Sequence, residues 1–143
     1  MGAGVAAVCV LVWSLMLSVY DIRERRLPNW LTLPGAGVIL VVAMAHGRGV
    51  AAVLGAVALF AVYAAVHLAS AAAMGAGDVK LAIGIGALTG TFGSDVWLLA
   101  ALGAPVLTAG WAVITALSRS GRTVPHGPSM CLAAVAATAM AVV

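Results

Sequence analysis

Long uncharged stretches, separated by short polar segments, dominate the hydrophobic pattern of this chain. The first runs from Gly2 to Tyr20, which is enough to cross a hydrocarbon core about 30 Å thick as a helix. The pattern therefore predicts an all-α, polytopic membrane protein, a bundle of six transmembrane helices forming one membrane-embedded domain over residues 1–143. The second helix is expected to end at about Ala45. The third, fourth and fifth are expected to run over Val50–Ala73, from Leu81 to about Phe92, and over Val96–Ser118, and the last is expected to end at Val143.

Composition agrees with a membrane setting. Of the 143 residues, 64% are hydrophobic and 8% are charged, and the mean hydropathy is +1.18. A chain this apolar has too few polar residues to cover the surface of a soluble globule. We therefore expect it to lie in the lipid bilayer, which is its first predicted partner. Cys9 and Cys131 lie in separate apolar stretches without CxxC spacing, so we expect no zinc site, no disulfide framework and no cofactor.

The basic residues orient the predicted bundle. Positive charges collect in cytoplasmic loops of membrane proteins. The first stretch has its charges after it, which is typical of a retained helix and not of a signal peptide. With the N-terminus outside, six of the seven basic residues fall inside and one outside. Because these charges occupy short loops without interleaved aromatics, no nucleic-acid binding is expected. The inside set is Arg23, Arg25, Arg26, Lys80, Arg119 and Arg122, and the outside residue is Arg48.

Glycine marks the fourth stretch as a closely packed helix. Gly86 and Gly90 have the GxxxG spacing that lets helix backbones approach each other. The stretch is also short, which would place Asp78 below the headgroups while local thinning keeps it accessible to water. In the second helix, Gly35 and Gly37 are expected to allow close helix contact or, with Pro34, a kink.

Two aspartates lie at the predicted cytoplasmic ends of their helices, in a chain with only four acidic residues. A charge inside a membrane segment costs about 2.5–3.5 kcal/mol and usually marks a functional site. Asp78 has an alternative interpretation as a helix cap. Near each other, Asp21 and Asp78 would not ionise together, so one would act as a base toward water and the other as an acid toward a carbonyl. Peptide hydrolysis then needs neither a metal nor a covalent intermediate.

Other polar residues have simpler interpretations. Ser94-Asp95 is expected to cap the fifth helix. His67 is either a proton relay or a histidine hydrogen-bonded to a neighbouring helix, and we assign it no role.

Three segments resemble the prepilin peptidases, also called type IV leader peptidases. Asp21-Ile-Arg-Glu-Arg-Arg-Leu-Pro-Asn-Trp-Leu-Thr is similar to the family's first aspartate motif, in which Pro-Asn follows the aspartate after a short spacer. Gly75-Ala-Gly-Asp-Val-Lys-Leu resembles the GxGD motif shared with other intramembrane aspartic proteases. Pro125-His-Gly-Pro resembles the segment that opens the last helix of the family. The resemblance covers essentially the whole chain.

The resemblance implies an activity and a substrate. Asp21 and Asp78 would be the catalytic pair of an aspartic-type endopeptidase. It would cut the basic leader from prepilins or pilin-like proteins at the cytoplasmic face of the bacterial plasma membrane, a step in pilus biogenesis and protein secretion. The identity of the substrate and the oligomeric state are not predicted.

Further residues of the two motifs are expected to shape the site or bind substrate. Pro28 and Asn29 belong to the first motif, and Gly75 and Gly77 would let backbone and substrate approach closely. Lys80 would attract an acidic residue near the start of the mature pilin helix, or alternatively anchor its own helix at the interface.

Two departures from the family pattern stand out. Larger members carry an N-terminal cytoplasmic region with paired CxxC cysteines, associated with methylation, whereas only Met1 precedes the first span here. We therefore expect peptidase activity alone, as in the compact members linked to tight-adherence pili. His126 stands where a less polar residue is expected, and the sequence offers no account of it.

Two other classes of function remain open. A small ion- or proton-conducting bundle would also need intramembrane carboxylates, although no inverted repeat is visible. A non-catalytic pilus-assembly factor would bind pilin helices without cutting them.

Overall fold

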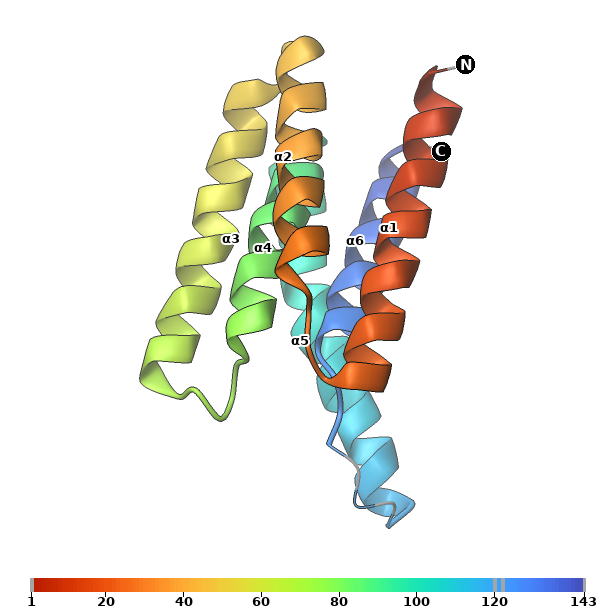
Figure 1. Ribbon diagram of the computed structural model, residues 1–143, viewed down its shortest axis with the longest axis vertical. Helices are drawn as coiled ribbons and strands as arrows, with labels where there is room; N and C mark the ends of the chain where they lie inside the picture. The colour runs from red at the N-terminus through yellow and green to blue at the C-terminus, as the bar shows by residue number, and fades with distance from the viewer. Residues whose placement is uncertain (1, 120, 122, 143) are drawn as a thin grey trace.

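Six α-helices make up the part of the chain that the computed structural model describes, residues 2–119, 121 and 123–142, and these residues form no strand. The all-α prediction is therefore confirmed. Successive helices run in opposite directions, so that both ends of the chain lie at the same end of the bundle (Figure 1). The helices are α1 (Gly2–Glu24), α2 (Asn29–Ala45), α3 (Gly49–Ala69), α4 (Ala76–Gly90), α5 (Ser94–Leu117) and α6 (Gly127–Val142).

Three of these helices, α1, α3 and α5, are long and apolar enough to cross a membrane. Helices α2 and α6 are apolar but shorter. Helix α4 has 15 residues, which at 1.5 Å per residue reach only about 22 Å. The long apolar helices indicate a membrane protein, in which the short helices depend on protein neighbours.

Several helix ends differ from the predicted ones. Helix α1 continues through Asp21 to Glu24, since a helix need not stop where its apolar stretch stops. Helix α3 ends at Ala69, because Ser70 has an extended backbone (φ −156°, ψ 96°). Helix α4 begins at Ala76 and not at Leu81.

The cap predicted for the fifth helix is wrong. Gly93 precedes α5 and makes no side-chain cap, while Ser94 and Asp95 lie in the first turn. Two other predicted features, Arg122 in the preceding loop and the end of the last helix at Val143, lie outside the described residues.

Helix α4 is the centre of the bundle and packs against α2, α3, α5 and α6 (Figure 1). Its closest neighbour is α3, where three glycines meet. A Cβ on Gly86 would lie 2.9 Å from the Cβ of Leu59, and one on Gly90 would lie 2.7 Å from the carbonyl oxygen of Ala51. Gly55 of α3 faces both glycines. The predicted close packing of this helix is therefore confirmed.

A tryptophan joins three helices on the other side of α4. The indole N–H of Trp13 in α1 donates to the carbonyl oxygen of Leu31 in α2, at 2.9 Å. Its ring lies against Gly35 of α2 and Gly84 of α4. Gly35 thus makes the expected close contact, whereas Gly37 faces open space.

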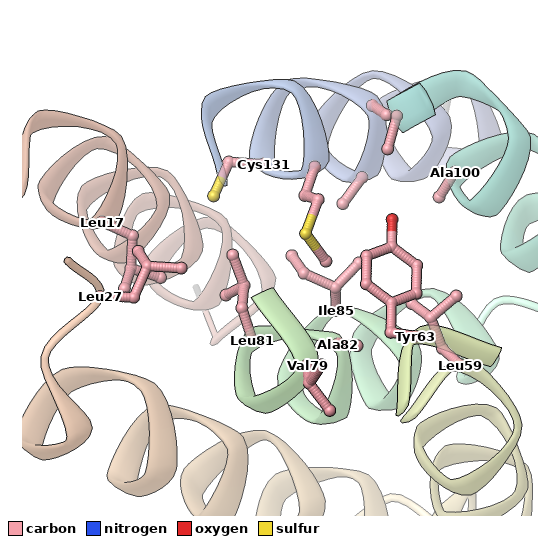
Figure 2. Packing of buried hydrophobic residues seen from close by; sticks show 14 of the residues in the cluster. Leu17, Leu27, Leu59, Tyr63, Val79, Leu81, Ala82, Ile85, Ala100 and Cys131 are labelled. Carbon is pink, nitrogen blue, oxygen red and sulfur yellow. The ribbon is translucent and has the colours of Figure 1, made fainter. Parts of the chain in front are cut away.

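The buried core joins α1, α3, α4, α5 and α6 and includes one polar aromatic side chain. Figure 2 shows Tyr63 of α3 with its hydroxyl turned away from its own helix, toward α5 and α6. In the same view Cys131 of α6 lies on the side of α1. The final turns of α1 and the first turns of α4 and α6 lie at the same end of the bundle, opposite the chain ends (Figure 1).

Candidate active site

The carboxylate of Asp21 is bound to the start of α6. Asp21 is only 8% exposed, and its Oδ2 accepts a hydrogen bond from the backbone N–H of Gly127 at 2.9 Å. The first N–H groups of a helix lack partners within the helix and carry partial positive charge, so they favour an anion. A Cβ at residue 127 would lie 2.7 Å from Oδ2, which explains a glycine at this position.

Asp78 lies in the first turn of α4 and is partly exposed. The backbone N–H of Gly75, the residue before α4, hydrogen-bonds its carboxylate. This contact is the local one that a capping role requires. Asp78 also interacts electrostatically with Asp21. The fold therefore places the two predicted aspartates, from α4 and α1, within electrostatic range of each other, although α1 packs chiefly against α6.

Arg25 ties the end of α1 to the segment before α6. Its backbone is left-handed (φ 54°), which ends the helix. The guanidinium donates from Nη1 to the Oγ1 of Thr123 at 2.9 Å, and its charge acts on Asp21. The α1–α2 and α5–α6 connections are thus held together next to the carboxyl pair.

The predicted site-shaping residues Asn29 and Lys80 contact each other. The Nζ of Lys80 donates to the Oδ1 of Asn29 at 2.9 Å. Pro28 precedes α2, and its carbonyl oxygen accepts from the Oγ1 of Thr32 at 3.2 Å. The structure thereby joins the Pro-Asn of the first motif to the helix that carries Asp78.

The two glycines of the second motif lie in different surroundings. Gly75 is exposed, and a Cβ there would lie 3.3 Å from the Oδ2 of Asp78. A Cβ on Gly77 would lie 3.2 Å from the Cβ of Leu27, so Gly77 lets α4 pack closely against the segment before α2. Gly77 serves packing here, while Gly75 leaves the space beside the carboxylate open.

Tyr63, Thr108 and His126 form a hydrogen-bonded group that the sequence did not predict. The hydroxyl of Tyr63 lies 3.0 Å from the Nε2 of His126, and the Oγ1 of Thr108 lies 2.6 Å from its Nδ1. Burial lowers the pKa of His126, so its imidazole is neutral at pH 7. Tyr63 in turn interacts electrostatically with Asp78. The available signals were a tyrosine inside an apolar stretch, which needs a partner for its hydroxyl, and the unexplained histidine.

His67 and Cys131 have partners other than the Tyr63–His126–Thr108 group. The Nδ1 of His67 lies 2.6 Å from the carbonyl oxygen of Met74, so its partner is the connection to α4 and not a neighbouring helix. Cys131 is buried and forms no disulfide, and it interacts electrostatically with both Asp21 and Asp78. Among the described residues, no three histidine, cysteine or acidic side chains gather closely enough to hold a metal ion.

Two open cavities, of about 460 and 490 Å³, lie near the end of α5, and neither aspartate lines them. The first is lined by Ile22, the residue after Asp21, and by Arg25 and Trp111. The second lies beside it and shares Thr123 and Val124. Space for a bound chain therefore exists beside the carboxyl pair.

Comparison with known proteins agrees with the geometry. The model of the type IV leader peptidase family matches residues 8–142, which include both aspartates and the Pro-His-Gly-Pro segment. No curated protein matches the chain, and no solved structure does. Because the family match extends over nearly the whole sequence, the chain belongs to the type IV leader peptidase family.

Proposed function

We propose that this protein is an aspartic endopeptidase in which Asp21 and Asp78 activate water to remove the basic leader from prepilins or pilin-like proteins. The observation that carries the proposal is the electrostatic interaction between the two carboxyl groups, which belong to residues of α1 and α4. Membership of a peptidase family supplies the reaction class.

The geometry suggests how the two groups divide the work. The Oδ2 of Asp21 is occupied by the N–H of Gly127, so its Oδ1 is the oxygen that shares a proton with Asp78 or with water. One carboxylate removes a proton from the attacking water, while the other, as the acid, protonates the carbonyl oxygen and then the leaving amine. The N–H of Gly127 fixes the orientation of Asp21 during both transfers.

Helix lengths and charges support a setting for the reaction. We propose a single membrane-embedded domain with six spans in the bacterial plasma membrane and the N-terminus outside. The carboxyl pair then lies at the cytoplasmic end, where Arg23, Arg25 and Arg26 also lie. A basic leader would be cut at that surface, just before the hydrophobic helix of the substrate enters the bilayer.

Lys80 and Gly75 are the proposed substrate contacts. Asn29 holds the Lys80 ammonium two residues beyond Asp78, where it would meet an acidic residue near the start of the mature pilin helix. Gly75 is exposed beside the Asp78 carboxylate and leaves room for an extended substrate backbone. Anchoring of α4 at the interface is the alternative role for Lys80.

The test is co-expression with a pilin-like protein, with leader loss followed by mass. We expect wild type to cleave, and Asp21→Asn and Asp78→Asn each to lower the rate by at least about 100-fold. Asp95→Asn is the matched control, since Asp95 lies in the first turn of α5, at the opposite end of the bundle (Figure 1).

Two results would count against the proposal. Cleavage that survives either substitution in the pair would eliminate the aspartic mechanism. Binding of the substrate without cleavage by wild type would instead favour a non-catalytic assembly factor.

A further inference from the structure

The cavity of about 460 Å³ lies between the end of α1, the last turns of α5 and the segment that precedes α6. Its volume is in the range of ligand pockets. The end of α1 is tied to that segment there, because the Nη1 of Arg25 donates to the Oγ1 of Thr123 at 2.9 Å. The lining includes Ile22, Arg25, Trp111, Ser118, Thr123 and Pro125.

This cavity adjoins the residues that hold the carboxylate of Asp21. Ile22 follows Asp21 in α1, and Pro125 stands two residues before Gly127, whose N–H binds the carboxylate at 2.9 Å. The Arg25–Thr123 hydrogen bond joins the same two segments further along each of them. A substrate held at the carboxyl pair therefore reaches the cavity within a few residues.

The position of the cavity along the bundle indicates which side of the scissile bond it serves. Thr108 of α5 is level with His126, since its Oγ1 lies 2.6 Å from the Nδ1 of the imidazole. Trp111 and Ser118 lie further along α5, about 4.5–15 Å beyond that level at 1.5 Å per residue. In that direction α5 extends beyond its neighbours (Figure 1). The mature pilin helix would enter the bilayer in the opposite direction, so the cavity lies on the side of the leader.

We propose that this cavity binds the last residues of the leader, and that Arg25 favours an acidic side chain over a basic one among them. The inference rests on the proposed function and adds a determinant of substrate specificity to it. From Trp111 to Ser118 the helix rises about 10 Å, which is the length of about three residues of extended chain. The cavity thus holds about three leader residues.

Charge decides which side chains fit beside Arg25. Among the described residues that line the cavity, Arg25 is the only charged one. A guanidinium has five N–H donors and pairs with a carboxylate through two of them, and the contact with Thr123 is made from Nη1 alone. A basic side chain in the cavity would meet a like charge. The basic residues of the leader are therefore expected further from the scissile bond, outside the cavity.

The rest of the lining suits an extended peptide. The hydroxyl of Ser118 donates to the carbonyl oxygen of Ile114 at 2.8 Å, which leaves its oxygen as an acceptor for a backbone N–H. Trp111, which is 39% exposed, offers an apolar face. An anionic lipid headgroup would also match the charge of Arg25, but the continuity with the carboxyl pair favours the peptide.

The first test measures discrimination between two substrates. Glutamate and lysine would be compared at each of the last three leader positions of a pilin-like protein. At one or more of these positions we expect wild type to have a kcat/KM at least about tenfold higher for glutamate, and Arg25→Gln to bring the ratio to within about twofold. A loss common to both substrates, including any effect of the Arg25 charge on Asp21, cancels in this ratio.

Two variants serve as controls for Arg25→Gln. Arg25→Lys keeps the positive charge and should keep the preference for glutamate. Arg26→Gln removes the same charge from the next residue, which is not among the lining residues, and should leave the ratio within about twofold of that of wild type. A preference lost equally in both glutamine variants would come from the general charge of the surface and not from the cavity.

The second test detects binding and needs no cleavage. Ser118→Cys would be combined with Asp78→Asn and Cys9→Ala, while Cys131 is buried and stays. The protein would be oxidised with a pilin-like protein that carries one cysteine, either in the leader or in the mature helix. We expect at least about fivefold more disulfide with the leader cysteine. Ser94→Cys is the matched control, because Ser94 is an exposed serine at the other end of α5.

The two tests separate the cavity from the proposed function. Disulfide formation between residue 118 and the leader, by a protein whose wild type cuts no pilin-like substrate, would support the cavity and count against the peptidase assignment. Cleavage by wild type without a preference, with a preference that survives Arg25→Gln, or with equal disulfide formation at residues 94 and 118, would overturn the inference. If residue 118 forms no disulfide and phosphatidylglycerol raises the unfolding midpoint of wild type but not of Arg25→Gln, the cavity binds a lipid headgroup instead.

Discussion

The absence of a side chain at Gly127 leaves room for the carboxylate of Asp21. Because a Cβ there would lie 2.7 Å from the Oδ2 of Asp21, Gly127→Ala must displace the carboxylate or the start of α6. We expect the rate of leader cleavage per folded molecule to fall at least about tenfold, since misplaced catalytic groups lose rate steeply. The rate would be measured after correction for the folded fraction.

Gly110→Ala is the matched control for this prediction. Gly110 lies within α5, and nothing stands within 4 Å of its added Cβ. The alanine should leave cleavage unchanged and stabilise the helix slightly. Unaltered cleavage by Gly127→Ala would mean that the Gly127–Asp21 contact has no part in the reaction.

The two aspartates could be predicted from the sequence, but the residues that surround them could not. Asp21 and Asp78 stand out because charges are rare in so apolar a chain. Tyr63 and Thr108 resemble ordinary members of long apolar stretches, and only the fold brings them to His126. Spacing along the chain gives no measure of such contacts, because they join residues of different helices.

At the scale of helices, the crossing of α3 and α4 depends on glycine. Gly86→Ala places a methyl group 2.9 Å from the Cβ of Leu59 and against the backbone of Gly55, neither of which can move aside as a flexible side chain would. Overpacking of this kind costs about 1–3 kcal/mol, more than the roughly 1 kcal/mol that alanine gains over glycine in a helix. We expect a lower midpoint of thermal unfolding in detergent.

Gly37→Ala tests whether glycine itself is the reason. Gly37 lies inside α2 with nothing within 4 Å of an added Cβ, so alanine should raise the unfolding midpoint or leave it unchanged. Equal behaviour of the Gly86 and Gly37 variants would contradict a close crossing of α3 and α4.

Helix ends were predicted less well than helix centres, for physical reasons. The apolar pattern reports where lipid or core begins, whereas a helix ends where its backbone hydrogen bonds end. Helix α1 therefore extends past its apolar stretch to Glu24. The small apolar residues after Ser70 suit a helix but do not form one. In Gly75-Ala-Gly only the first glycine stands outside α4, which places Asp78 at a helix start and not in a loop.

For the molecule as a whole, unequal helix lengths accompany unequal surroundings. Helices α1, α3 and α5 are long and largely exposed, as contact with lipid requires. Helix α4 is short, carries Asp78 and Lys80, and is enclosed by other helices along most of its length. A helix that meets protein and not lipid needs neither the length nor the uniform apolarity of a span. At the end that carries the carboxyl pair, α5 extends beyond its neighbours (Figure 1).

The orientation of the bundle is the prediction that decides where a substrate can be cut. Single cysteines would be introduced at Arg26 and Ala72, which flank α2 and α4, and at His46 in the α2–α3 turn. The background would have Cys9 and Cys131 replaced by alanine, provided that it still folds. In intact cells a membrane-impermeant maleimide should label residue 46 alone, and residues 26 and 72 should react only after permeabilisation, because positive loops stay inside.

The reverse labelling pattern would place Asp21 and Asp78 at the outer face of the membrane. The leader of a prepilin lies on the cytoplasmic side and could not reach the two aspartates there. The proposed substrate would then be wrong even if the carboxyl pair were active. Labelling of residues 26 and 72 on opposite sides would mean that the helices do not all cross the bilayer. The two carboxyl groups could then meet only if one of them entered the membrane from the other surface, which the contact of Asp21 with the start of α6 opposes.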